Sequence, residues 1–276
     1  MDTVTIVDEA YSATKEMVID SPTPQNTETH VKFPHGMVAE TVLDRAKAMI
    51  PHAMITKESY GLQDAPHPDE KDQDGNPVIV KDANLYGAFN LGWDDHRHED
   101  KCWEFIIAFR NSHVKKYPCE VFSGEEILVC FNGLITGTQG VSARHTPNGW
   151  EKFEYQLYKM LGNLEQEYNT VDERITRLQQ TQIGDGDAAE IILQNINWKN
   201  IDGNKEAFPI FRQYKDYADS EHQYFDAFGE RTGWSLYNAF SDVIKPTVLK
   251  GNKMRGAGIA LSFDSFMHDK SPKVIN

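Results

Sequence analysis

The sequence has few cysteines and lacks any long apolar run. It holds three cysteines in 276 residues, none in a C-x-x-C spacing, which is more typical of a reducing cytoplasm than of a disulfide framework or a zinc site. The longest stretch without a charged residue, Ile127 to Ala143, contains Gly, Asn, Thr and Gln and is too polar to cross a bilayer. No basic segment followed by an apolar one opens the sequence, so we expect a cytoplasmic protein without membrane contact.

Common catalytic motifs are also missing. The sequence contains no G-x-x-x-x-G-K-[ST], G-x-G-x-x-G, H-E-x-x-H or G-x-S-x-G pattern, so nucleotide hydrolysis, Rossmann redox chemistry and zinc proteolysis lose support. The cysteines fall in predicted strands, where a cysteine is more often a small buried hydrophobe than a nucleophile. No catalytic residue and no cofactor is indicated, and a non-enzymatic role is favoured without being decided.

Acidic residues are concentrated at the front of the chain. The formal net charge is −14, and the first hundred residues hold 19 acidic and 8 basic residues. Net charge bears on solubility and nonspecific association rather than on fold. If one face presented this acidity, it would imitate the phosphates of nucleic acid, which keeps open the hypothesis of an acidic interaction protein.

An irregular leader precedes one predicted domain. Residues 1–36 are polar and contain three prolines and a Ser/Thr/Asn-rich stretch, which predicts little regular structure. Residues 37–276 are expected to form a single α+β domain. At its start, apolar residues at helical spacing predict a short helix from Met37 to Ile50, whereas the proline- and acid-rich residues 63–82 predict an exposed loop.

Alternation with a period of two predicts an antiparallel sheet over about 84–145. One predicted strand runs from Leu85 to Leu91 and another from Trp103 to Phe109, each with apolar residues sharing one face. Asn132-Gly133 between two apolar runs predicts a type I′ hairpin over 127–136, because Asn and Gly accept its positive φ angles.

A helical part is predicted over 147–276. Thr146 before Pro147 predicts a helix start. A helix over 148–182 then carries a heptad seam, and we expect it to cross the sheet; self-association of two copies through residues 150–182 is the alternative. Two further helices are predicted, one with a capping box at Asp187 and Glu190 and one from Trp234 to Ile244, before Pro246. The seam consists of Leu157, Leu161, Leu164, Tyr168, Val171, Ile175 and Leu178.

Basic residues interleaved with aromatic ones form the best candidate binding surface. One group follows the Trp103 strand and another precedes the long helix, so both would lie at one end of a meander. Cations with stacking groups are typical of surfaces that bind nucleic acid. A further basic group lies near the C-terminus. The candidate nucleic-acid-binding residues are Arg110, Asn111, His113, Lys115, Lys116, Arg144, His145, Lys250, Lys253 and Arg255.

Potential metal ligands are densest at His96 and His98, which four acidic residues flank. The loop predicted there fixes no coordination geometry, so these histidines are weak candidates and no metal site is assigned. The segment from Glu70 to Gly75 superficially follows a calcium-binding loop, but Lys81 stands where a bidentate Glu is required. We interpret this segment as a turn.

Four segments carry a family resemblance. They are Arg110 to His113 with Lys115, Val129 to Asn132, Arg144 to Thr146, and Trp234 to Val243. In this order they resemble the phage/plasmid-like family called domain of unknown function 932, over roughly residues 84–245. The chain departs from that family at Val114, where an acidic residue often stands, and at Phe131, where Asp is usual. The resemblance implies a phage or mobile-element origin and a life in the cytoplasm of a bacterial host, and it carries over no catalytic residue.

Three functional hypotheses follow. A sheet followed by a long helix is similar in outline to the core of ring-forming single-strand annealing proteins of phages. With the basic and aromatic residues, this favours non-enzymatic binding of single-stranded nucleic acid in replication or recombination. One alternative is an acidic protein of host takeover or anti-defence that binds a host protein, and another is a metal-dependent hydrolase using His96 and His98.

Overall fold

The computed structural model describes residues 10–93, 103–127, 140–249 and 253–270. The contacts within the chain divide it into two compact units. Unit 1 comprises residues 1–124 and 138–165, and unit 2 comprises residues 125–137 and 166–276. The expectation of one domain over residues 37–276 stays a prediction.

A six-stranded antiparallel sheet, whose strand order follows the sequence, gives the chain its α+β class. The predicted strands that begin at Leu85 and Trp103 are confirmed as parts of β3 and β4. The predicted hairpin over 127–136 lies, apart from Ile127, outside the described residues. The strands are β1 (Tyr11–Ala13), β2 (Ala53–Lys71), β3 (Pro77–Trp93), β4 (Trp103–Ser112), β5 (Cys119–Ile127) and β6 (Gly140–Ala143).

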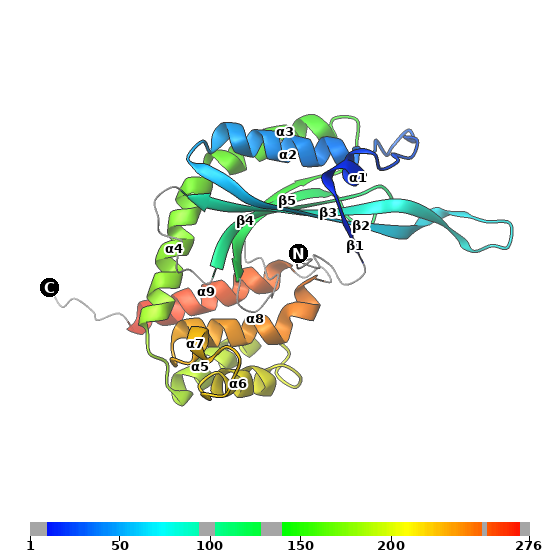
Figure 1. Ribbon diagram of the computed structural model, residues 1–276. Coiled ribbons are helices and arrows are strands. Elements are labelled where there is room, and N and C mark those ends of the chain that lie inside the picture. Colours follow the sequence, from blue (N-terminus) through cyan, green and yellow to red (C-terminus); the bar gives the residue numbers. More distant parts are fainter. Residues whose placement is uncertain (1–9, 94–102, 128–139, 250–252, 271–276) are drawn as a thin grey trace. The chain divides into compact units, whose positions relative to one another are not determined.

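β2 and β3 continue past the other strands as a two-stranded arm, so the loop predicted over 63–82 is wrong (Figure 1). Ala65 pairs with Val80 and Pro66 with Ile79. The acidic turn at the tip is held by Asp72, whose Oδ1 accepts the backbone N–H groups of Asp74 and Asn76 at 2.9 and 2.8 Å. The polar and proline-rich composition suggested a loop. Beyond the buried Ala65, however, most side chains of the arm are exposed, and an exposed ribbon needs no apolar alternation.

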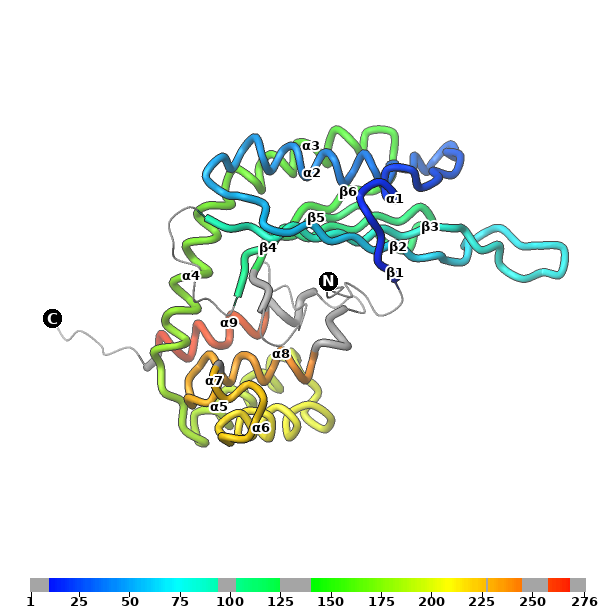
Figure 2. The backbone as a smooth tube through the Cα atoms, in the orientation of Figure 1, coloured from blue at the N-terminus to red at the C-terminus, as the bar shows by residue number. Residues whose placement is uncertain are grey.

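Two helices distant in sequence lie side by side on one face of this sheet (Figure 2). α2 (His35–Met49) confirms the helix predicted from Met37, and buries Val38, Val42 and Leu43. α3 (Gly149–Gly162) buries Phe153 and Leu157 on its inner side. The leader is less irregular than expected, because β1 pairs with β2 and α1 (Lys15–Ile19) follows it.

The long helix predicted over 148–182 is divided. α3 ends at Gly162, and α4 (Leu164–Gln180) begins after Asn163. The predicted cap is also displaced, since Asn148 rather than Thr146 precedes α3. All seven seam residues are at most 3% exposed, so the seam is part of the protein's own core. Self-association through residues 150–182 stays a prediction, and it would have to use the outer faces of these helices.

Helices make up the described remainder of unit 2. The capping box predicted from Asp187 to Glu190 is wrong in its position. The N-cap residue of α5 is Gly184, and its backbone N–H donates to the carboxylate of Asp187. α8 buries Trp234, Leu236, Tyr237 and Phe240 as expected, but it continues through Pro246. No helix in the described ranges has both the length and the apolar character needed to cross a membrane. The helices are α5 (Asp185–Asn197), α6 (Ala207–Asp216), α7 (Phe225–Phe228), α8 (Gly233–Leu249) and α9 (Lys253–Lys270).

Candidate functional site

Arg110, the predicted binding cation in β4, is neutralised inside the protein. Arg110 donates from Nε to Glu120 at 2.6 Å, and its guanidinium lies 4.4 Å from the centre of the Tyr117 ring. Both charged side chains are largely buried, at 21% and 11% exposure. Breaking such a pair leaves an uncompensated charge in a poorly solvated place. Arg110 is therefore held within the protein rather than presented to a ligand.

Three of the predicted binding residues are buried. Asn111, His113 and His145 are 0%, 1% and 5% exposed. Asn111 lies at the centre of a hydrogen-bond network: its Nδ2 donates to the Phe33 carbonyl at 2.7 Å and to Nδ1 of His35 at 2.9 Å. Its Oδ1 accepts from Nε2 of His145 at 2.8 Å. This side chain thus connects β4 to the end of the leader and to the segment before α3.

The histidines around Asn111 are uncharged at neutral pH. The rings of His35 and His113 stack with their centres 3.8 Å apart. Nε2 of each donates to a backbone carbonyl at 2.9 Å, which fixes the proton on that nitrogen. Burial lowers the pKa of His113 to about 4 and that of His145 to about 3, and it holds the pKa of His35 well below its usual value. These side chains stabilise unit 1, and they offer no positive charge to a phosphate.

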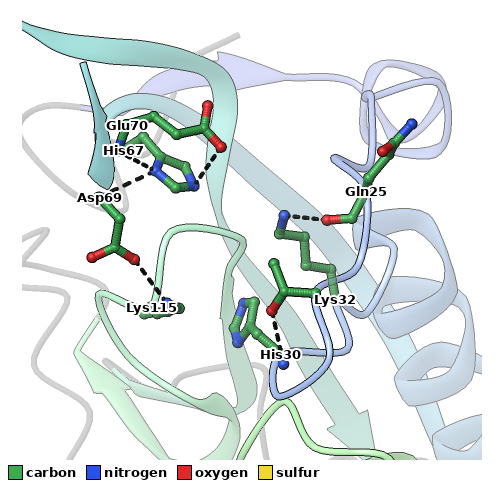
Figure 3. A network of polar contacts seen from close by, with 8 residues as sticks. Gln25, His30, Lys32, His67, Asp69, Glu70 and Lys115 are labelled. Carbon is green, nitrogen blue, oxygen red and sulfur yellow. Dashed lines mark hydrogen bonds and ion pairs between the residues drawn. The ribbon is translucent and has the colours of Figure 1, made fainter.

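The turn after β4 presents the cations that stay accessible. Lys115 has a left-handed backbone conformation (φ 60°), and its ammonium pairs with Asp69 of the arm at 2.9 Å (Figure 3). Both side chains are about half exposed or more. Lys116 is exposed and its Nζ lies 3.4 Å from Oε1 of Gln63. Arg144 lies in the segment before α3 and its side chain is exposed. Among the described side chains, it has no carboxylate partner.

A basic segment of the leader faces the same turn. Lys32 is only 8% exposed, and its Nζ donates to the Gln25 carbonyl at 2.5 Å. Burial lowers the pKa of Lys32, and so does the charge of Lys115. His30 lies beside both lysines, which lower its pKa after the larger effect of burial. Figure 3 shows His67, Asp69 and Glu70 of the arm near Lys115, so both cations and carboxylates lie close to this turn.

The outer side of α3 carries residues that the sequence prediction missed. Tyr155 and Tyr158 are 62% and 61% exposed, although large aromatic side chains are usually buried. Lys152 and Lys159 flank them, and Nζ of Lys159 lies 5.2 Å from the centre of the Tyr155 ring. The K-x-x-Y-x-x-Y-K spacing could have revealed these residues from the sequence. It was missed because this helix was interpreted from its apolar seam, which lies on the opposite, buried side. We call these four residues the α3 tyrosine face.

The remaining predicted residues lie outside what the structure describes. His96, His98 and Lys250 are not in the described ranges, and Lys253 and Arg255 belong to the start of α9, where side chains are not described. Within the described residues, no group of three His, Cys, Asp or Glu side chains is arranged to hold a metal ion. The metal-dependent hydrolase hypothesis at His96 and His98 therefore stays a prediction.

Comparison with known proteins gives one match. Residues 92–255 match the family described as "Domain of unknown function (DUF932)". No curated protein and no solved structure matches the chain. The matched region includes Lys115, Arg144 and the α3 tyrosine face, whereas the β2 and β3 arm lies before it. Because the match covers more than half of the sequence, this chain belongs to the DUF932 family, as its motifs predicted.

Proposed function

We propose that unit 1 binds single-stranded nucleic acid without catalysing a reaction, in the replication or recombination of a phage or other mobile element. The observation that carries this proposal is the α3 tyrosine face, with two exposed aromatic rings between two exposed lysines. Proteins that bind single strands without sequence preference combine cations for the backbone with aromatic rings for the bases.

The accessible cations supply the phosphate contacts. An exposed ion pair such as Lys115 with Asp69 contributes roughly 0–1 kcal/mol, so a phosphate can replace the carboxylate at little cost. Lys116 and Arg144 have no carboxylate to give up among the described residues. Arg110 would have to leave Glu120 and the ring of Tyr117, so we no longer expect it to contact nucleic acid.

Titration of a labelled single strand at increasing salt tests the proposal. Each neutralised phosphate contributes about −0.7 to the slope of log affinity against log salt for single strands. The triple variant K115A/K116A/R144A is therefore expected to make that slope shallower by about 2. No binding of the wild-type protein at 50 mM salt would overturn the proposal.

Variants of the tyrosine face test the stacking contacts separately. Removing a ring that stacks on a base costs about 1–3 kcal/mol, which corresponds to a loss of affinity of about fivefold or more for Tyr155→Ala and for Tyr158→Ala. Both positions are exposed, so the fold is expected to tolerate these changes. Phe208→Ala, which removes a 73% exposed ring in unit 2, is the matched control and should leave the affinity unchanged.

A second candidate function is binding of a host protein through the acidic arm. The arm carries Glu70 and Asp74 on exposed positions, and Ile79 on it is 63% exposed. An exposed apolar side chain among acidic ones fits a protein partner with a basic rim. Capture of one defined host protein by the wild type, lost in the variant E70Q/D74N/I79S, would favour this function over the first.

A further inference from the structure

A hollow in unit 2 is independent of the surfaces above. It has a volume of about 450 Å³ and lies between the end of α4, α7 and the start of α8. This volume is within the range of small-molecule sites, which combine apolar walls with a few polar groups. Two aromatic rings and two carboxylates contribute to its lining, together with an amide and a hydroxyl. The lining residues are Gln179, Phe225, Asp226, Gly229, Glu230, Thr232 and Trp234.

Asp226 and Glu230 line the hollow from α7 and from the segment that follows it. Asp226 belongs to α7, and Gly229 after it keeps a helical conformation (φ −63°, ψ −27°). Glu230 lies outside α7, directly after its C-cap residue Gly229. The segment after Glu230 is anchored to the end of α4, since Ile183 donates to the Arg231 carbonyl at 2.8 Å and Gly233 donates to the Thr181 carbonyl at 2.9 Å.

Two cations of unit 2, Arg231 and Lys215, pair with a carboxylate outside the hollow. Arg231 pairs with Asp185, and its guanidinium lies 5.0 Å from the centre of the Tyr214 ring. Lys215 pairs with the same carboxylate of Asp185 at 3.5 Å. Among the described side chains, neither Asp226 nor Glu230 has a cationic partner. The hollow therefore combines two uncompensated negative charges with the exposed ring of Phe225, which is 37% exposed.

We propose that this hollow binds a guanidinium group, as carried by an arginine side chain of a partner or by a small guanidino compound. A planar guanidinium can donate to two carboxylates at once and lie flat on an aromatic ring. An ammonium ion is more strongly hydrated and lacks the fork geometry, so it binds more weakly at such a site. An anion is excluded by the two carboxylates.

Calorimetric titration of the full chain with butylguanidinium tests this inference. n-Butylurea is the matched uncharged probe of nearly the same shape, and n-butylammonium tests the preference for the planar cation. We expect binding of butylguanidinium, weaker binding of butylammonium and none of butylurea. Raising the salt from 50 to 500 mM should weaken the binding, because both carboxylates are solvent-exposed.

Substitutions then locate the site. Asp226→Asn and Glu230→Gln should each lower the affinity about tenfold, and Phe225→Leu about threefold. Glu190→Gln removes an exposed charge of the same unit outside the hollow and should change nothing. Equal binding of the urea and the guanidinium, or unchanged affinity in the D226N/E230Q double variant, would overturn the proposal.

The source of the guanidinium is decided by a second pair of titrations. A short peptide with one arginine between glycines is compared with the same peptide carrying citrulline. Binding tighter than that of butylguanidinium, lost with citrulline, assigns the hollow to a protein partner. Binding of butylguanidinium alone assigns it to a small guanidino compound. Neither result depends on whether unit 1 binds nucleic acid.

Discussion

Asn111 shows how one polar side chain joins segments that are far apart in sequence. It has no exposed surface and makes three hydrogen bonds, to the backbone of Phe33 and to the rings of His35 and His145. A buried polar group is favourable only when its hydrogen bonds are made. This amide makes hydrogen bonds to one carbonyl and two imidazoles at once. Asn111 therefore has a structural role, although the basic residues near it in sequence predicted a contact with nucleic acid.

Removing this amide is expected to destabilise unit 1 strongly. Asn111→Ala leaves Nδ1 of His35 and Nε2 of His145 without a partner, whereas the Phe33 carbonyl keeps the hydrogen bond from Nε2 of His113. Each buried group that loses its partner costs about 1–3 kcal/mol. We expect a loss of at least roughly 2 kcal/mol in the free energy of unfolding, measured by urea denaturation. Gln156→Ala on the exposed side of α3 is the control, and it should stay within about 0.5 kcal/mol of the wild type. Equal stability of the two variants would contradict the network.

The buried histidines predict a loss of stability in acid. Their pKa values in the folded state lie below the ordinary 6.5, at about 4 for His113 and about 3 for His145. The unfolded chain therefore binds protons first as the pH falls. Stability is fully present above pH 6.5 and is lost between pH 6.5 and 4, by about 1.4 kcal/mol per pH unit for each histidine.

Chemical denaturation at several pH values measures this dependence. His145→Gln keeps an N–H donor near Asn111 and removes one titrating group, so the slope should fall by about 1.4 kcal/mol per pH unit. His52→Gln, at an exposed position before β2, is the control. The same slope in the wild type and in His145→Gln would show that His145 is not buried in its neutral form.

At the scale of elements, two glycines of unit 1 should respond to alanine in opposite ways. A Cβ at Gly162, the last residue of α3, would meet only the Met49 methyl at 3.9 Å. A Cβ at Gly87 in β3 would fall 2.1 Å from Cζ of the Phe109 ring. Gly162→Ala is expected to stabilise the protein by up to about 1 kcal/mol, whereas Gly87→Ala must displace a buried ring and should cost at least about 1–3 kcal/mol.

Thermal unfolding of the two alanine variants checks this contrast. A gain in melting temperature for Gly162→Ala and a loss for Gly87→Ala are expected. A loss for both would mean that the break between α3 and α4 needs the glycine. In that case the backbone conformation at Gly162, and not the space around it, would exclude a side chain.

Periodicity predicted elements best where one face is buried. β3, β4, α2 and α8 were found because their apolar residues repeat at two or at about 3.6 positions. The arm was missed because most of its side chains beyond Ala65 are exposed. The break at Asn163 was missed because the seam continues through it. Pro246 does not end α8. A proline inside a helix costs about 3 kcal/mol, but the packing of the buried residues of α8 can outweigh this cost.

At the scale of the whole molecule, acid should affect the two units unequally. The buried histidines of the network, His35, His113 and His145, all belong to unit 1, whereas His222 and His268 of unit 2 are not buried. Hydrogen exchange between pH 7 and 4.5, corrected for intrinsic rates, is therefore expected to show β2, β3 and β4 losing protection before α5, α6 and α8. Simultaneous loss in all of these elements would contradict this order.

Composition, the period of apolar residues and four short motifs by themselves determined the α+β class, several helices and strands, and the family. The helices and strands follow from the spacing of apolar residues within short segments, and the family follows from short motifs, so residues close in sequence are sufficient for both. Only the tertiary structure decided which polar side chains are accessible, since burial and pairing arise between residues far apart in sequence. Asn111, His113 and Arg110 look like binding residues beside Lys115, but partners 78, 80 and 10 positions away hold them inside.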